Sequence, residues 1–346
     1  MGIAGASKLP GISVALATYN GSNFLRDQLE SIAKQTVLPA ELVVSDDGSD
    51  DGSLDVIRDF AASAPFAVRI LPEHDRLRFA DNFLNAALHC QHEIVAFSDQ
   101  DDVWLPRKLE TGLRRLTEDG SLLCLHTLTL TDEMLRPTGR FNQGIVADTI
   151  FEVLEIDPYM TGWGNTMMFR RELAGLIDRR KRPRHPGSDR PLSHDTWIYS
   201  LAAALGRVSH IAEPLILYRQ HGDNAAGFRK GTVADRFNEM RTVPMGAYRE
   251  RMIFNAAMAS LLEQVAQEAE GDLRLTARRA ADVYTVREER VARRIELHQG
   301  KSVRQRLAAY RSLRGSVRND PAALKRQHLA GAKDLLLGVA ALGRHR

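Results

Sequence analysis

The run Ser98-Asp99-Gln100-Asp101-Asp102 places three carboxylates directly after an apolar stretch, Ile94-Val95-Ala96-Phe97. An apolar stretch of this length is typical of a buried strand. Carboxylates that stand together at the end of a strand repel one another, so keeping all three ionised costs free energy. A divalent cation removes that cost, because Mg²⁺ and Mn²⁺ take oxygen ligands and also bind phosphate oxygens. The run therefore predicts a metal site, and the metal in turn favours a diphosphate ligand.

Apolar stretches alternate with segments of helical spacing through the first hundred residues. We predict strands at 12–17, 41–45, 68–71 and 93–97, and helices at 24–33, 54–62 and 79–89. This alternation predicts an α/β fold with a doubly wound, mostly parallel sheet. Ligands of such sheets bind beyond the carboxyl ends of the strands. Because Thr18, the Asp46-Asp47 pair and the acidic run all follow strands, we expect them to meet at one edge.

The chain has 346 residues, of which 44% are hydrophobic, enough for one large core and a smaller appendage. The pattern becomes helical after about residue 230, which predicts two domains, 1–230 and 231–346. The helical part has two apolar faces: Phe254, Met258, Leu261 and Val265, and Leu329, Ala332, Leu336 and Val339. Segment 179–194 is rich in Pro, Gly and charge, which predicts a mobile loop.

Charge is distributed unevenly along the chain. Residues 271–346 carry 18 Lys and Arg against 7 Asp and Glu, whereas residues 1–270 carry 29 against 37. A basic tail suits an anionic membrane surface, and the alternative is a helical bundle packed on the first domain with a solvated basic face. Formation of a homodimer through the tail is compatible with both. We do not expect a nucleic-acid partner, because the chain lacks stacking motifs and a recognition helix.

The cysteines and the N-terminus indicate a compartment. Cys90 and Cys124 have no CxxC partner, which favours a reducing environment. Residues 1–11 lack the features of a signal peptide, and no apolar run approaches the roughly 18 residues of a membrane span. We therefore expect a cytoplasmic protein, with the basic tail as the means of peripheral attachment to the inner face of the membrane.

Three motifs in this order resemble the family 2 glycosyltransferases: Ala17-Thr18-Tyr19-Asn20-Gly21, Ser45-Asp46-Asp47-Gly48-Ser49 and Ser98-Asp99-Gln100-Asp101-Asp102-Val103-Trp104. The third is similar to the rhamnosyltransferase-like branch, whose bacterial enzymes build surface polysaccharides. The resemblance is dense over residues 12–115, resumes at 161–163, 194–197 and 218–224, and fades in the tail. It implies the GT-A fold, here with a C-terminal helical extension. It also implies inverting transfer of a sugar from a nucleotide-diphosphate donor, UDP- or dTDP-linked, to a hydroxyl of a glycan or lipid-linked acceptor.

The resemblance also implies roles for individual residues. Asp195 matches the catalytic base. Donor contacts are expected from Ala17, Thr18, Tyr19, Asp46, Asp47, Asp99 and Gln100, and the metal ligands for Mn²⁺ or Mg²⁺ from Asp99, Asp101, Asp102 and His221. Where family members often carry Asn-x-Gly before the third helix, this chain has no glycine, so Arg76 or Arg78 is expected to reach the diphosphate instead.

Each assignment has a structural alternative. Asp-Asp-Gly-Ser is common in plain turns, and Asp195 is a favoured type of residue for capping the helix that follows it. His221 suits an ordinary loop, and Trp163 and Trp197 suit either a wall for the acceptor or the core.

Two other functions compete with an active transferase. One is a catalytically silent partner that binds sugar nucleotides in a polysaccharide assembly complex, against which the complete acidic run and Asp195 argue. The other is a nucleotidyltransferase, which would need a Gly-rich basic loop after the first strand. The processive synthases' Gln-x-x-Arg-Trp motif is missing, so we expect one sugar per encounter.

Overall fold

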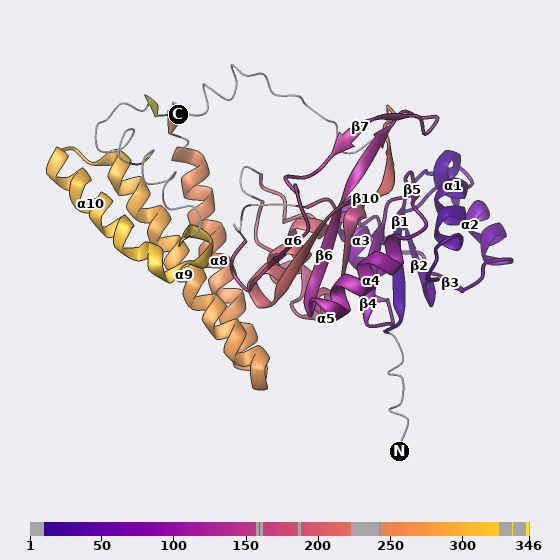
Figure 1. Cartoon of the computed structure of the whole chain (residues 1–346), viewed down its shortest axis with the longest axis horizontal. Coiled ribbons are helices and arrows are strands. Elements are labelled where there is room, and N and C mark those ends of the chain that lie inside the picture. The colour runs from indigo at the N-terminus through magenta and orange to yellow at the C-terminus, as the bar shows by residue number, and fades with distance from the viewer. Residues whose placement is uncertain are drawn as a thin grey trace.

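The computed structural model describes residues 10–156, 159, 162–185, 188–222, 242–243, 245–324, 334 and 344–345. A central mixed sheet carries helices on both faces, and three long helices lie together at one end of the molecule (Figure 1). No helix in this described part of the chain is both long and apolar enough to cross a bilayer.

The N-terminal part alternates strands and helices as the sequence predicts, with bounds that differ by one or two residues. Its elements are β1 (Ile12–Thr18), α1 (Ser22–Ala33), β2 (Glu41–Asp46), α2 (Ser53–Ala61), β3 (Ala67–Ile70), α3 (Arg78–Leu88) and β4 (Ile94–Ser98). A short β5 (Val103–Trp104) and α4 (Lys108–Glu118) follow the acidic run.

The middle of the chain completes the sheet. It contains β6 (Ser121–Thr131), β7 (Pro137–Phe141), β8 (Thr149–Phe151), the 3₁₀ turn η1 (Gly164–Thr166), β9 (Met167–Arg170), α5 (Glu172–Gly175), the 3₁₀ turn η2 (Arg179–Lys181), α6 (His194–Leu205) and β10 (Arg207–Arg219). The strand order is β3-β2-β1-β4-β9-β6-β10-β5, with β7 on β6 and β8 on β10. The pairs from β3 to β4 are parallel, and so is β6 with β10, whereas β9 runs antiparallel to both of its neighbours.

The central strands β1 and β4 bury both of their faces, as expected for a doubly wound sheet. In β1, Ile12, Val14 and Leu16 belong to a core beneath α1, α2 and α4, whereas Ala15 and Ala17 belong to a second core beneath α3 and α6. This division follows from the alternation of side chains along a strand. The long apolar runs that predicted the strands therefore reflect burial on two sides.

The C-terminal helices are α8 (Met245–Glu268), α9 (Gly271–Gln299) and α10 (Val303–Gly315), followed by the turn η3 (Ser316–Asn319). The core on the α6 side of the sheet continues into α8 and α9, where it includes buried Phe254, Met258 and Tyr284. The Arg287 side chain also donates to the carbonyl of Leu154, at 2.8 Å. These helices thus pack on the first domain. The predicted face at 329–339 and the predicted boundary near residue 230 lie outside the described residues.

The predicted mobile loop at 179–194 is held down by ion pairs in its described part. The Arg182 side chain is 3% exposed and pairs with Asp81 of α3 at 2.7 Å, and Arg179 donates to the backbone carbonyl of the same residue. A short bridge joins Arg184 to Pro191. Arg179 and Arg182 thus hold this segment on α3, and Arg190 of the same segment lines the cavity described next.

Candidate active site

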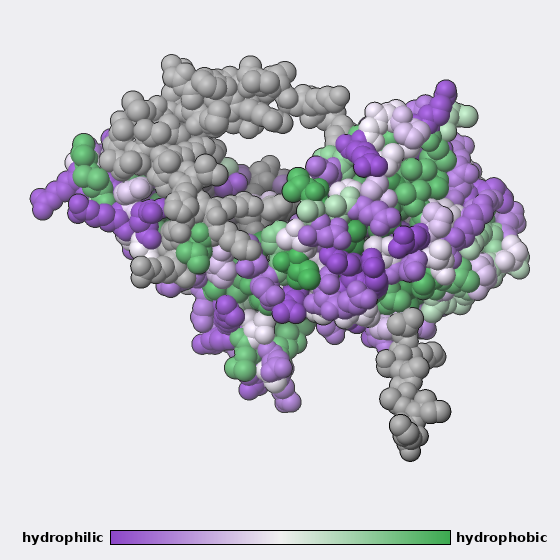
Figure 2. Space-filling model, viewed as in Figure 1, coloured by the Kyte–Doolittle hydropathy of each residue, from purple (hydrophilic) through white to green (hydrophobic). Residues whose placement is uncertain are grey.

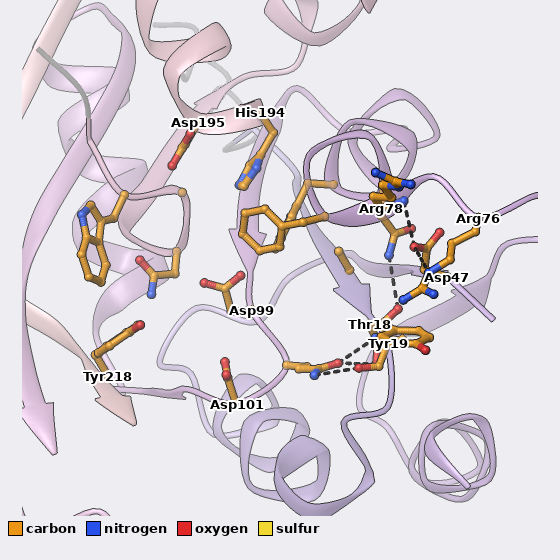
Figure 3. A pocket seen from close by; sticks show the side chains of 18 of the residues that line it. Thr18, Tyr19, Asp47, Arg76, Arg78, Asp99, Asp101, His194, Asp195 and Tyr218 are labelled. Atoms are coloured by element: carbon orange, nitrogen blue, oxygen red, sulfur yellow. Dashed lines mark hydrogen bonds and ion pairs between the residues drawn. The ribbon is translucent and has the colours of Figure 1, made fainter. Parts of the chain in front are cut away.

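A cavity of about 570 Å³ opens at the carboxyl ends of β1, β2 and β4 (Figure 3). This volume is within the usual range for small-molecule sites. Nine of the predicted site residues line it: Ala17, Thr18, Tyr19, Asp47, Arg78, Asp99, Gln100, Asp101 and Asp195. The other three, Asp46, Asp102 and His221, are not part of the lining. The expectation that separate strand ends supply one site is thereby met in the fold.

The turn after β1 is clamped to the acidic run by Gln100. The amide oxygen of Gln100 accepts from Thr18 Oγ1 at 2.8 Å and from Tyr19 N at 2.9 Å, and its Nε2 donates to Tyr19 O at 3.1 Å. A Cβ on Gly21 would lie 2.4 Å from this amide, so glycine is needed there. Gln100 was predicted to contact the sugar donor. Its side chain instead forms hydrogen bonds with Thr18 and Tyr19 that shape the wall of the cavity.

Asp47 organises the start of α3. Its carboxylate accepts from Leu77 N at 2.5 Å and from Arg78 N at 2.8 Å, so a distant side chain caps this helix. Arg78 has a φ of 65°, a left-handed conformation that costs a non-glycine residue about 1–2 kcal/mol. Arg76 lies 3.7 Å from Asp47 and over the Tyr19 ring, 4.2 Å from its centroid. Two arginines thus border one side of the cavity.

Asp46 has the turn role that was its structural alternative. Its carboxylate accepts from Gly48 N at 3.0 Å and Ser49 N at 2.8 Å, and also from Ser49 Oγ. The side chain therefore accepts its hydrogen bonds within the Asp-Asp-Gly-Ser turn and does not line the cavity. Between the two neighbouring carboxylates, only Asp47 lines the cavity.

The acidic run has two of its carboxylates at the cavity. Asp99 lies between the Arg78 side and the Asp195 side of the opening, with Asp101 nearby (Figure 3). Burial raises the pKa of Asp99 well above its usual range, and the charges of Asp102 and Asp101 add to this effect. His221 approaches from the end of β10, with Nε2 2.9 Å from Asp101 Oδ2.

Arg219 fixes the backbone of the acidic run, a role that the sequence alone did not suggest. Its buried guanidinium donates to Asp101 O at 3.0 Å and to Glu133 O at 2.7 Å, and pairs with Asp27 at 2.7 Å. Arg219 lies two positions before His221, within residues 218–224, where the resemblance to the family resumes. The end of β10 therefore both supports Asp101 and presents a histidine to it.

Asp102, which was predicted as a metal ligand, is not among the residues that line the cavity. It is fully buried and accepts from Asn165 Nδ2 at 2.6 Å. Burial and the charge of Asp101 raise its pKa. Lys108, also fully buried, lies with its ammonium 3.9 Å from the Trp104 ring centroid and donates to Asn165 O. Burial lowers the pKa of Lys108 to about 7, although Asp102 and Asp99 oppose that shift.

The donor set at the cavity suits a hard or borderline divalent cation. Among the described residues, no three His, Cys, Asp or Glu side chains converge closely enough to hold a metal ion by themselves. Asp101 and His221 do meet, and Asp99 has a carboxylate whose ionisation its neighbours oppose. Carboxylate and imidazole are ligands of Mn²⁺, and the carboxylates alone suit Mg²⁺. These residues therefore fit a cation whose remaining ligands come from a bound molecule.

Asp195 lies on the opposite side of the cavity from Arg78 (Figure 3). It is in the first turn of α6, and its Oδ1 accepts from Thr196 N at 2.6 Å and from Ser193 Oγ. These contacts orient the half-buried carboxylate. Within the described chain, Oδ2 has no hydrogen-bond partner. One oxygen thus stabilises the helix start while the other is available to accept a proton.

The two tryptophans take different positions. Trp197 is completely buried in the core, so it forms no wall for an acceptor. Trp163 lines the cavity and packs at 5.0 Å from the Tyr218 ring, which also lines it.

Sequence reasoning missed several other lining residues: Phe79, Asn82, Gly164, Asn165 and Arg190. Asn82 donates to Thr18 O at 3.2 Å, which joins α3 to the turn after β1. Its position in the stretch where family members carry Asn-x-Gly was the available signal. Gly164 and Asn165 follow Trp163, a residue that the resemblance had already marked. Arg190 belongs to the charged segment 179–194, and its place at the cavity depends on how that segment packs.

Comparisons with known proteins agree with this geometry. Residues 13–176 match the model of glycosyl transferase family 2. The chain is similar to the dTDP-rhamnosyl transferase RfbG of Shigella flexneri, with 29% identity over 222 residues that make up 61% of this chain and 73% of the relative. It is also similar to an uncharacterized glycosyltransferase of Nostoc sp., with 28% identity over 221 residues, 62% of this chain and 66% of the relative.

Among solved structures, the fold is similar to residues 1–349 of TarS from S. aureus in complex with UDP-GlcNAc. The TM-score is 0.51 at 18% identity, with 96% of this chain and 90% of that chain covered. At this identity the likeness concerns the fold alone. The family match over residues 13–176 identifies a family 2 glycosyltransferase domain in this part of the chain, and the structural likeness supports the GT-A fold.

Proposed function

We propose that the protein transfers one sugar from a UDP- or dTDP-linked donor to a hydroxyl of a glycan or lipid-linked acceptor, with inversion and with Mn²⁺ or Mg²⁺ as cofactor. The observation that carries this proposal is the arrangement of one cavity. Arginines and a capped turn lie on one side, Asp99 and Asp101 lie in the middle, and Asp195 lies across from the arginines. A donor that spans the cavity would bring its anomeric carbon close to the carboxylate of Asp195.

The nucleotide belongs on the side formed by Thr18, Tyr19 and Asp47. Arg78 is exposed there, and an arginine fork matches the oxygens of a diphosphate. Arg76, stacked on Tyr19, adds a second positive charge within reach of the same ligand. The Asp47 carboxylate attracts the Arg76 side chain and accepts a hydrogen bond from the backbone N–H of Arg78. One carboxylate therefore positions both arginines.

Asp101 and His221 would hold the divalent cation, with Asp99 beside them. When bound, the cation neutralises the negative charge of the departing diphosphate. Arg219 contributes from outside the cavity, since its hydrogen bond to Asp101 O fixes the backbone that carries the ligand.

The transfer step is assigned to Asp195 as general base. The acceptor oxygen attacks the anomeric carbon, its proton passes to Asp195 Oδ2, and the bond to the diphosphate breaks to release the nucleoside diphosphate. A single displacement of this kind inverts the anomeric configuration. The contacts of Ser193 and Thr196 to Oδ1 leave Oδ2 to face the substrate.

The dTDP donor class and a role in bacterial surface polysaccharide synthesis, as O-antigen, capsule or exopolysaccharide, gain support from the similarity to RfbG, which is named a dTDP-rhamnosyl transferase. The UDP class stays in the proposal because a UDP sugar occupies a structure of similar fold. Neither similarity decides which sugar this chain uses, since specificity depends on a few contacts within the cavity.

A thermal-shift panel tests the proposal. UDP, dTDP and GDP, and their sugars, are added with and without Mn²⁺ or Mg²⁺. A ligand that binds only the folded state raises the melting temperature according to its occupancy. We expect one nucleotide class to stabilise the protein only with the metal. A folded protein that responds to none of them would contradict the proposal, and binding without any transfer to acceptors would favour a catalytically silent partner.

We also propose that the protein works in the cytoplasm, docked on the anionic inner face of the membrane through its C-terminal helices. Arg304 and Arg311 are exposed on α10, beside Val303, which is 62% exposed. Figure 2 shows hydrophilic side chains over the outer end of this helix. Each basic residue near an anionic leaflet contributes about 1 kcal/mol. Sedimentation with liposomes tests this, and binding that is indifferent to anionic lipid and to salt would contradict it.

A further inference from the structure

His194 is a buried histidine whose ring nitrogens have no protein partner in the described part of the chain. The side chain is 1% exposed, yet it lines the cavity beside Asp195 (Figure 3). A buried polar group left without a hydrogen bond costs about 1–3 kcal/mol. Such a cost at the wall of a binding cavity indicates a group that is satisfied by the ligand.

The ring is held in a fixed orientation by aromatic side chains. It stacks on Phe83, with centroids 4.1 Å apart and planes 11° apart, and it meets Phe79 and Phe97 edge-on. This apolar cage disfavours the charged imidazolium, and burial lowers the pKa of His194 to about 4. The ring is therefore neutral at physiological pH, with one nitrogen as donor and the other as acceptor.

Gly164 packs directly against the edge of this ring. A Cβ at Gly164 would lie 2.4 Å from His194 Nε2, so any other residue would press against that nitrogen. Gly164 also lines the cavity, and the adjoining Asn165 has its own unpartnered Oδ1 there, within the described chain. The absence of a side chain at Gly164 thus lets the backbone of η1 lie against Nε2 without a clash.

A sugar hydroxyl fits these properties better than a phosphate does. A hydroxyl both donates and accepts, as a neutral imidazole does, whereas a phosphate favours the cationic arginines on the other side of the cavity. Phe79 is 52% exposed at the same wall and offers an apolar face to a sugar ring.

We propose that His194 is a specificity-determining residue that hydrogen-bonds a sugar hydroxyl, on the transferred sugar or on the acceptor, in the substrates of the transfer proposed above. Gly164 allows the backbone of η1 to pack against the ring at this wall of the cavity. A site built to bond a hydroxyl rejects analogues that lack it, because its own polar group is then left unpaired.

The test compares nucleotide with nucleotide sugar on the full chain. We measure Kd for dTDP and dTDP-rhamnose, and for UDP and UDP-GlcNAc, by calorimetry with Mn²⁺ in wild type and H194F. Phenylalanine preserves the aromatic stack but removes both nitrogens. We expect the Kd of the free nucleotide to be the same in H194F and wild type. The gain in affinity that the sugar provides, which is the Kd of the nucleotide divided by the Kd of the nucleotide sugar, should fall about 10-fold or more in H194F. H194Q, which restores a donor and an acceptor, should recover part of this gain. If H194F does not fold, H194Q is compared with wild type instead.

The matched control is H210F, because His210 is buried and neutral but lies outside the cavity, bonded to Tyr199. A second arm separates the two sources of the hydroxyl. If the donor-sugar affinity is unchanged but KM for a saccharide acceptor rises in H194F, the acceptor supplies the hydroxyl. If neither quantity changes while wild type binds a nucleotide sugar, the role of His194 is overturned and the proposed function stands. If wild type binds no nucleotide sugar, both are overturned.

Discussion

The imidazole Nε2 of His221 lies 2.9 Å from Asp101 Oδ2, although 120 residues separate the two in sequence. Asp101 follows β4, and His221 follows β10, which lies three strands away in the sheet. Phe24 of α1 packs against the histidine ring at 4.5 Å and supports it from behind. The fold therefore brings a carboxylate and an imidazole together at the point where a donor diphosphate is expected.

Replacing His221 by alanine should weaken the metal-dependent part of nucleotide binding. Loss of a ligand for the cation, or of the group that orients Asp101, typically costs at least about 10-fold in metal affinity. Calorimetry with Mn²⁺ should show this loss, whereas binding measured in excess chelator should not change. The exposed His89, at the end of α3, provides the matched control H89A. An unchanged Mn²⁺ dependence in H221A would remove this histidine from the metal site.

Asp195→Asn should leave donor binding nearly intact and reduce kcat by about 10²–10⁴-fold. The amide retains an oxygen for Thr196 N, but it cannot take the proton of the acceptor hydroxyl. Rates with saturating donor and acceptor test this. Asp189→Asn is the control, because that side chain is 98% exposed in the preceding segment. Full activity of D195N would exclude Asp195 as the base.

Arg78 should respond differently to glycine and to alanine. Its φ of 65° strains any residue with a Cβ, so R78G should be more stable to unfolding than R78A by about 1 kcal/mol. Both variants lose the guanidinium and should bind the nucleoside diphosphate about equally weakly. Urea unfolding and nucleotide titration measure the two effects separately. Equal stability of the two variants would show that the backbone at this position is not strained in solution.

The parts of this fold that sequence could predict are those controlled by local pattern. Buried strands such as β1 and β4 appear as short apolar runs, and α1 and α3 appear through helical spacing. The antiparallel insertion of β9 between β4 and β6 had no such signal, because it depends on a pairing that forms over a long sequence separation. The same limit applies to segment 179–194, which was predicted as a mobile loop but has Arg179 and Arg182 paired with Asp81.

Individual roles in the site were harder to predict than the site itself. The acidic run was predicted as one group of ligands, yet Asp99 and Asp101 line the cavity while Asp102 is buried against Asn165. Adjacent residues at a strand end point in different directions, and sequence does not say which of them turns inward. Similarly, Asp46 and Asp47 are neighbours of identical chemistry, but one closes a turn and the other caps α3.

The buried histidines should lower the stability of this protein as the pH falls below about 6.5. Burial lowers the pKa of three histidines: His126 to well below its usual range, and His194 and His210 to about 4. An unfolded histidine has a pKa of about 6.5. Below about pH 6.5 these three side chains therefore bind more protons in the unfolded chain than in the folded chain, so their contribution to the free energy of unfolding falls as the pH falls. The raised pKa values of Asp99 and Asp102 act in the opposite direction.

His210→Gln isolates one of these contributions, because His210 lies outside the cavity. Between pH 7 and pH 5, the decrease in unfolding free energy should be smaller in H210Q than in wild type by about 1–2 kcal/mol. Urea unfolding at several pH values measures this decrease. Loss of the hydrogen bond to Tyr199 lowers the stability of H210Q equally at every pH, so it does not change the difference between two pH values. His89→Gln is the exposed control. If H89Q reduced the pH dependence as much as H210Q, burial of the imidazole would not be its cause.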